Sequence, residues 1–186
     1  MTSVGDFKRL TETKIHQGYV WHLSTAEFES PEGEVFSRDI VRSPGAVGVL
    51  PLMFSPRGEA EVVLVRQFRP PYGRAVIEIP AGMRDIEGED TGDVARRELI
   101  EEAGLSAGSI EYLTEIYPSP GMTDSITTLY LATDCTAVPH DRQGPEEAHL
   151  EVLRITLAEA IGMVERAEIC DAKSVVALLL ADRRLR

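Results

Sequence analysis

The sequence has few of the features that mark several large classes of protein. Only two of its 186 residues are cysteines, Cys135 and Cys170, and their spacing fits neither a disulfide framework nor a zinc site. No run of about 18 apolar residues occurs, so no membrane-spanning helix is expected. The first residues do not have the basic-then-apolar layout of a signal peptide. We therefore expect a cytoplasmic protein that does not act at a membrane.

Basic residues are scarce relative to acidic ones. The chain has 19 Lys and Arg residues against 31 Asp and Glu residues, which gives a formal net charge of −12. A nucleic-acid-binding surface needs clustered Lys and Arg, so nucleic acid is not an expected partner. A small anionic substrate remains compatible with this charge, because it needs only local positive charge from metal ions or a few arginines.

The pattern of apolar residues predicts an α+β protein in which helices pack on a mixed β-sheet. Residues 1–43 are predicted to form a small antiparallel β module, and residues 44–186 the main domain. One helix is expected to begin with Thr91 or Asp93 as its cap and to end at Gly104 in the left-handed conformation. Two later helices are expected after the Thr156 capping box and after Asp171.

Residues 82–105 contain three carboxylates at helical spacing. Glu98, Glu101 and Glu102 are related by i, i+3 and i, i+4 steps, which puts them on one face of a helix. Like charges at this spacing destabilise a helix by a few tenths of a kcal/mol per pair, so a cation is expected to neutralise them. Mg²⁺, a hard cation that prefers oxygen ligands, is the natural candidate, with Mn²⁺ as an alternative. A glutamate cluster alone is usually a solvated helix face, so the surrounding residues are needed to distinguish a metal site from such a face.

The wider segment resembles the Nudix box, which has a glycine, a glutamate and then Arg-Glu-apolar-x-Glu-Glu-x-Gly-apolar. Its positions are filled by Gly82, Glu89, Arg97, Glu98, Leu99, Glu101, Glu102, Gly104 and Leu105. Six residues rather than the usual five separate the first glycine from the first glutamate, which lengthens a loop and leaves the helix intact. The resemblance implies a Nudix fold and a set of site roles. Glu98 and Glu102 are then the primary metal ligands, Glu101 is a third ligand or a catalytic orienting group, the Ala81 carbonyl is a further ligand, and Arg97 pairs with Glu89.

Three features outside the box resemble the ADP-ribose pyrophosphatase branch of this family. They are Pro120, which lies fifteen residues after Leu105, the segments 65–69 and 78–82, and the C-terminal segment 171–178. The resemblance implies Mg²⁺-dependent hydrolysis of ADP-ribose to AMP and ribose 5-phosphate. Arg69 is expected to contact the substrate diphosphate, since arginine suits bidentate phosphate recognition. Glu78 is expected to orient the loop or to support the metal ligands.

The resemblance also implies a general base on a late loop and a homodimer. Glu147 is the favoured base, with Glu146 as the alternative because the alignment across this loop is ambiguous by one residue. The two subunits would share each site through the N-terminal module, where Tyr19, Trp21 or Arg38 could stack on the nucleobase.

Two other functions are compatible with these residues. One is a Nudix hydrolase that acts on another nucleoside diphosphate sugar or on a dinucleotide. The other is a non-catalytic Nudix module that binds a nucleotide as a sensor. Such modules typically lack box glutamates, whereas this chain retains all of them.

Overall fold

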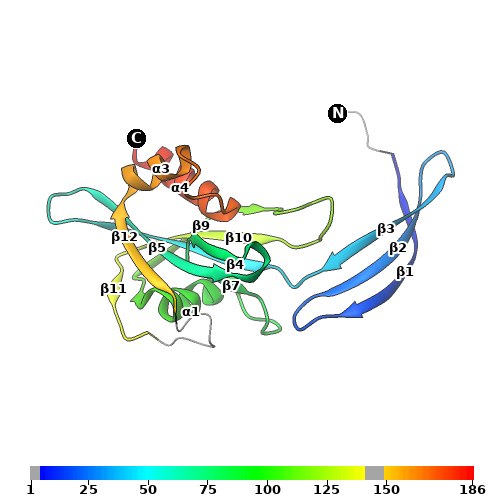
Figure 1. Ribbon diagram of the computed structural model, residues 1–186, viewed down its shortest axis with the longest axis horizontal. Helices are drawn as coiled ribbons and strands as arrows, with labels where there is room; N and C mark the ends of the chain where they lie inside the picture. Colours follow the sequence, from blue (N-terminus) through cyan, green and yellow to red (C-terminus); the bar gives the residue numbers. More distant parts are fainter. Residues whose placement is uncertain (1–4, 141–148) are drawn as a thin grey trace. The chain divides into compact units, whose positions relative to one another are not determined.

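The computed structural model describes residues 5–140 and 149–186, and the chain forms two units (Figure 1). The first unit consists of Met1–Gly45 together with Ser119–Ile126. The second unit consists of Ala46–Pro118 and Thr127–Arg186. Each unit therefore contains segments that are far apart in the sequence.

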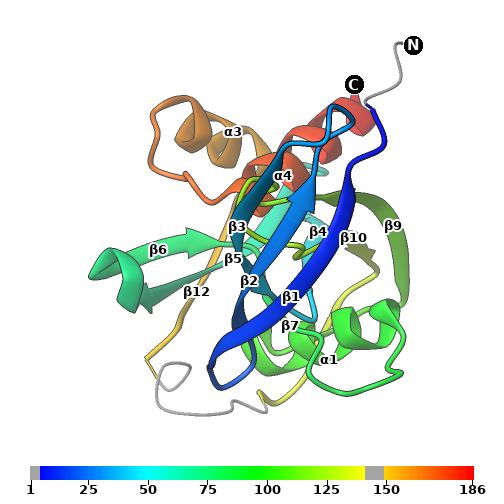
Figure 2. The ribbon, with the colours of Figure 1, turned by 90° about the vertical axis from the view of Figure 1, so that its right-hand side faces the viewer.

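The first unit is built on a three-stranded antiparallel sheet. Its strands are β1 (Lys8–Gln17), β2 (His22–Glu29) and β3 (Val35–Arg42), in the order β1-β2-β3 (Figure 2). The segment Ser119–Ile126 joins the end of β3, where the backbone N–H of Val41 donates to Met122 O and Thr123 Oγ1 donates to Val41 O. A long loop of the sequence thus becomes part of the N-terminal unit.

The second unit contains a mixed seven-stranded sheet. Its main path runs in the order β12-β5-β4-β10-β9, with β6 paired to β5 and β7 paired to β4. The bounds are β4 (Ala46–Phe54), β5 (Ala60–Arg69), β6 (Arg74–Glu78), β7 (Ala81–Met83), β9 (Ser109–Ile116), β10 (Thr127–Thr133) and β12 (Glu151–Thr156). Strands β4 and β10 run parallel, whereas the other pairs in this sheet are antiparallel. A short 3₁₀ helix, η1 (Pro70–Tyr72), connects β5 to β6, and β8 (Leu105–Ser106) pairs with β11 (Thr136–Ala137).

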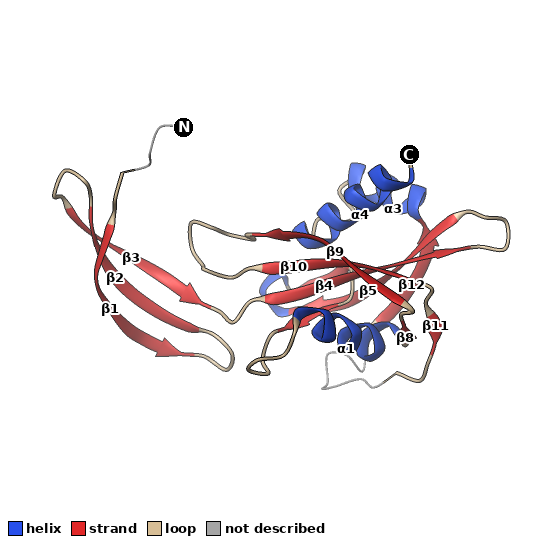
Figure 3. Ribbon diagram, turned by 180° about the vertical axis from the view of Figure 1, so that it is seen from behind, coloured by secondary structure: helices blue, strands red, loops and turns tan. Residues whose placement is uncertain are grey.

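Helices cover both faces of this sheet (Figure 3). Helix α1 (Thr91–Ala103) packs on one face, and α3 (Leu157–Glu165) and α4 (Ala172–Leu185) pack on the other. The side chains of β4 pack on both faces of the sheet. Val47 and Val49 belong to the cluster under α1, and Leu50 and Leu52 belong to the cluster under α3 and α4. This explains why β4 is an almost continuous apolar run, as is typical of a strand that is buried on both faces.

The predicted α+β fold and the small N-terminal antiparallel sheet are confirmed. The predicted N-cap of the box helix, Thr91 or Asp93, was wrong. Asp90, rather than Thr91 or Asp93, is the N-cap, and its side chain accepts a hydrogen bond from the Gly92 N–H at 2.8 Å. Gly104 ends the helix in the left-handed conformation with φ 62°, as predicted. None of the described helices has the length and hydropathy of a membrane-spanning segment.

Candidate active site

Three glutamates lie on the buried face of α1. Glu98, Glu101 and Glu102 are 5%, 9% and 4% exposed, although carboxylates are almost never buried to this degree unless they are paired. The apolar residues Val94 and Leu99 anchor the same helix on the sheet. The core packing of α1 therefore brings the carboxylates of Glu98 and Glu102 against β7.

The backbone of β7 lies very close to two of these carboxylates. The Ala81 N–H donates a hydrogen bond to Glu102 Oε2 at 2.9 Å. A Cβ atom placed on Gly82 would lie only 2.0 Å from Glu98 Oε1. A side chain at residue 82 would therefore occupy the space that the Glu98 carboxylate now fills.

Arg97 connects the loop before α1 with the glutamates on the helix. Its Nη1 donates to Glu98 Oε1 at 2.7 Å and to Glu101 Oε2 at 3.2 Å. Its Nε and Nη2 donate to the two carboxylate oxygens of Glu89, each at 3.4 Å. Burial acts to lower the pKa of Arg97, but the hydrogen bonds to Glu89 and the charges of Glu98 and Glu101 outweigh it and raise the pKa. The arginine thus remains a cation in contact with the carboxylates of Glu89, Glu98 and Glu101.

The chemistry of this set of donors fits a hard divalent cation. Three buried carboxylates and the adjacent backbone of Ala81 supply oxygen ligands of the kind that Mg²⁺ and Mn²⁺ prefer. Within residues 5–140 and 149–186, no three His, Cys, Asp or Glu side chains converge closely enough to enclose an ion. Glu98 and Glu101 both contact the Arg97 guanidinium in this structure. The oxygen donors of these residues fit the ion in kind, and two of the three carboxylates are paired with Arg97.

Arg69 and Glu78 form a bidentate ion pair at the ends of β5 and β6. Arg69 Nε donates to Glu78 Oε1 at 2.7 Å, and Arg69 Nη2 donates to Glu78 Oε2 at 2.8 Å. The hydrogen bonds to Glu78 raise the pKa of Arg69. Arg69 lines a cavity of about 270 Å³ whose wall also includes Ala81, Gly82 and Met83. Arg69 therefore lines the same cavity as the β7 backbone, which contacts the box glutamates.

Pro120 lies in the first unit, in the segment Ser119–Ile126. It lines a cavity of about 380 Å³ together with Phe28, Phe36 and Arg38, and the Arg38 guanidinium lies 4.7 Å from the centre of the Phe36 ring. Of the three predicted stacking residues, Arg38 is thus at this cavity. Tyr19 is fully exposed, and neither it nor Trp21 lines the cavity.

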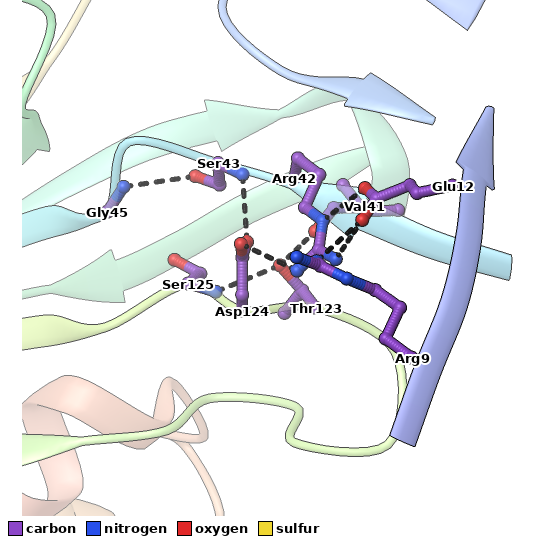
Figure 4. A network of polar contacts seen from close by, with 9 residues as sticks. All are labelled: Arg9, Glu12, Val41, Arg42, Ser43, Gly45, Thr123, Asp124 and Ser125. Carbon is purple, nitrogen blue, oxygen red and sulfur yellow. Dashed lines mark hydrogen bonds and ion pairs between the residues drawn. The ribbon is translucent and has the colours of Figure 1, made fainter. Parts of the chain in front are cut away.

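A polar network fastens the Pro120 segment to β3 (Figure 4). The Arg42 guanidinium donates to both carboxylate oxygens of Glu12 at 2.8 Å and to Asp124 Oδ2 at 3.0 Å. Asp124 Oδ1 in turn accepts the backbone N–H of Ser43 at 3.1 Å. The hydrogen bond from Arg42 lowers the pKa of Glu12 to about 2.

The candidate bases Glu146 and Glu147 lie outside the described residues.

Two polar residues near the box were missed by the sequence analysis. Gln67 is 4% exposed, and its Nε2 lies 3.4 Å from Glu102 Oε1. Its spacing could have indicated its burial, because Val63, Val65 and Gln67 are each two residues apart and therefore lie on the same face of β5. Lys173, which pairs with Glu78, lies in the C-terminal segment 171–178, and no local sequence pattern indicates this partner.

Comparison with known proteins decides the family. The family model described as the NUDIX domain matches residues 43–178. The chain belongs to the Nudix family. The predicted enzyme class, a Nudix hydrolase, is thereby confirmed, and members of this family act on small nucleotide substrates and generally use divalent metal ions.

Individual Nudix relatives extend over most of the chain. An ADP-ribose pyrophosphatase of Bacillus subtilis (strain 168) is 36% identical over 171 residues, which cover 92% of this chain and 90% of that protein. A methanol dehydrogenase activator of Bacillus methanolicus is 34% identical over 171 residues, again covering 92% and 90%. A solved structure described as an ADP compounds hydrolase has a TM-score of 0.83 at 20% identity and covers 100% of this chain and 97% of that chain. The predicted resemblance to ADP-ribose pyrophosphatases is confirmed, and the structural likeness concerns the fold.

Proposed function

We propose that this Nudix hydrolase cleaves the diphosphate of ADP-ribose to give AMP and ribose 5-phosphate, with Mg²⁺ as its ion and Mn²⁺ as a substitute. The observation that carries the proposal is the buried carboxylate face of α1 against the β7 backbone, which lines the same cavity as Arg69. The similarity to an ADP-ribose pyrophosphatase over 92% of the chain supports the choice of substrate.

Each residue of the box has a distinct role in this proposal. Glu98 and Glu102, with Glu101 and the Ala81 carbonyl, would hold the divalent ion, which supplies positive charge against the phosphate oxygens when it is bound. Arg97 holds the loop at Glu89 next to the helix and keeps neighbouring carboxylates from repelling each other. These contacts keep the charged groups in place before the substrate arrives.

Arg69 is proposed to bind the substrate diphosphate. Its Nε and Nη2 edge is occupied by Glu78, so the Nη1 edge of the guanidinium is the part that can meet a phosphate oxygen. Glu147, or Glu146 beside it, is proposed to take the proton from the attacking water. Pro120, which belongs to the first unit, is proposed to contribute to selectivity for ADP-ribose.

The N-terminal module, residues 1–43, is proposed to form a homodimer and to contribute substrate contacts, with residues 44–186 as the hydrolase domain. Strand β1 is exposed along its whole length and includes the apolar residues Leu10 and Ile15, so it offers a surface for a second copy. Size-exclusion chromatography and activity on dilution test this, and a monomer that stays fully active would contradict it.

Both cysteines are free, in keeping with the reducing cytoplasm that we propose as the location.

The decisive experiment is a product assay on the purified protein. ADP-ribose is incubated with and without Mg²⁺, and AMP and ribose 5-phosphate are separated by chromatography, with ADP-glucose and a dinucleoside diphosphate run in parallel. Metal-dependent AMP that forms fastest from ADP-ribose is the expected result. Faster cleavage of another compound would assign the chain to the alternative nucleotide-sugar or dinucleotide hydrolases. Tight nucleotide binding without turnover would instead favour a sensor.

A further inference from the structure

Lys173 is a largely buried cation in the first turn of α4, and it has no part in the proposed reaction so far. Its side chain is 14% exposed. Its Nζ pairs with the Glu78 carboxylate and lies 3.0 Å from Asp171 Oδ1. A buried ammonium is costly unless it is paired, so these two carboxylates determine where the side chain lies.

Glu78 is shared between this lysine and Arg69. Its Oε2 accepts hydrogen bonds from both Lys173 Nζ and Arg69 Nη2, while its Oε1 accepts from Arg69 Nε. Glu78 is 3% exposed, and burial acts to raise its pKa. The hydrogen bond from Arg69 and the charge of Lys173 outweigh burial and lower the pKa. The carboxylate is therefore ionised and binds two cations from different parts of the sequence.

The same turn of α4 also holds the backbone next to Glu78. Ser174 is fully buried, its Oγ accepts the Ile79 N–H at 2.8 Å, and it donates to Asp171 Oδ2 at 2.6 Å. Asp171 is the N-cap of α4. The side chain and the backbone of consecutive residues, Glu78 and Ile79, are thus both fixed by the start of one helix.

Arg69, Asp171 and Lys173 all line the 270 Å³ cavity that includes Ala81 and Gly82. We propose that Lys173 is a positioning residue, which holds Glu78 and through it keeps the Arg69 guanidinium at the place where the substrate diphosphate binds. This inference rests on the proposed function, since it concerns the same site. It assigns α4, which has no residue in the Nudix box, a role in substrate binding.

Lys173→Met tests the inference, because it removes the ammonium and keeps an unbranched side chain. A misplacement of about 1 Å in such a site can cost about a hundredfold in rate, so we expect kcat/KM to fall at least about tenfold, mostly through a higher KM. Calorimetric binding of ADP in the presence of EDTA should weaken by a similar factor without any turnover. Lys173→Arg should restore part of both losses. Arg183→Met is the matched control, since Arg183 is exposed near the other end of α4 and should behave as wild type.

The double variant Arg69→Met/Lys173→Met separates positioning from direct contact with the substrate. If Lys173 acts through Arg69, its removal should cost almost nothing more once Arg69 is gone. An equal loss in both backgrounds, or wild-type KM and ADP binding in Lys173→Met, would overturn the inference and leave the proposed function standing. A wild-type protein that neither cleaves nor binds any nucleoside diphosphate would refute both. If Lys173→Met does not fold, Lys173→Gln, which removes the charge but leaves a polar side chain, is measured in the same way and should show a smaller loss of the same kind.

Discussion

Gly82→Ala is expected to leave the fold intact and to remove most of the activity. A Cβ atom at residue 82 would lie 2.0 Å from Oε1, 2.2 Å from Cδ and 2.5 Å from Oε2 of Glu98, whereas ordinary contacts begin near 3.4 Å. The carboxylate must therefore move by more than 1 Å. Gly82 is not among the glycines with positive φ, so its backbone conformation is open to alanine.

The expected loss follows from that displacement. Because Glu98 is a proposed primary metal ligand, moving its carboxylate by this distance should lower kcat/KM by about a hundredfold. The collision involves the far end of a flexible side chain, so the melting temperature should change by only a few degrees. Steady-state kinetics on the substrate that the product assay identifies, at saturating divalent metal, and thermal unfolding of the same sample measure the two effects.

Gly162→Ala is the matched control for this prediction. A Cβ atom there would lie 2.9 Å from Nη1 of Arg166, which is again the end of a flexible side chain, but one that is half exposed at the C-terminal end of α3. Activity should be unchanged, and stability should rise by about 0.5–1 kcal/mol because alanine replaces glycine within a helix. Wild-type kcat/KM in Gly82→Ala would refute the reasoning, since it would mean that turnover does not depend on where the Glu98 carboxylate lies.

Three further predictions concern charged groups. Glu98→Gln and Glu102→Gln should fold normally, as circular dichroism would report, and should lose metal-dependent turnover by at least about a hundredfold; wild-type activity in either would contradict the metal assignment. Arg97→Gln should lower the free energy of unfolding by about 1–3 kcal/mol in a denaturant titration, because it removes a cation from between carboxylates, and an unchanged midpoint would count against that role. The pKa of Glu12 is lowered from 4.5 to about 2 by Arg42, so its contribution to stability should be complete above about pH 4.5 and should disappear as the pH falls toward 2. Hydrogen exchange of β1 across this range should show that decline in the wild type and should not show it in Arg42→Ala.

The sequence was sufficient where structure depends on neighbouring residues. The box helix, its glycine stop and the capping residues Thr156 and Asp171 all follow from local rules, and each is present in the structure. The N-cap of α1 shows the resolution of such rules. Asp90, Thr91 and Asp93 are all suitable capping residues, so composition alone does not tell which of them is the N-cap.

Contacts between distant segments could not be predicted in the same way. The Lys173–Glu78 pair joins residues 95 positions apart, and the Arg42–Asp124 pair joins residues 82 positions apart. No local pattern specifies either partner, because both pairs depend on tertiary contacts that bring distant segments together. This is why local patterns point to the carboxylates that are proposed for the site but not to how Arg69 and the Pro120 segment are held.

The same distinction explains why the reaction class is easier to predict than the substrate. The groups that are proposed to act on the diphosphate lie mostly within residues 82–102, in one loop and one helix of the second unit. The groups that are proposed to select the substrate lie in the first unit, where Arg38 and Pro120 come from segments about 80 residues apart and line one cavity with Phe28 and Phe36. Substitutions on that cavity wall should therefore change the ratio of kcat/KM values between nucleotide substrates more than they change metal dependence. Substitutions in the box should do the opposite, because they alter a step that every diphosphate substrate shares.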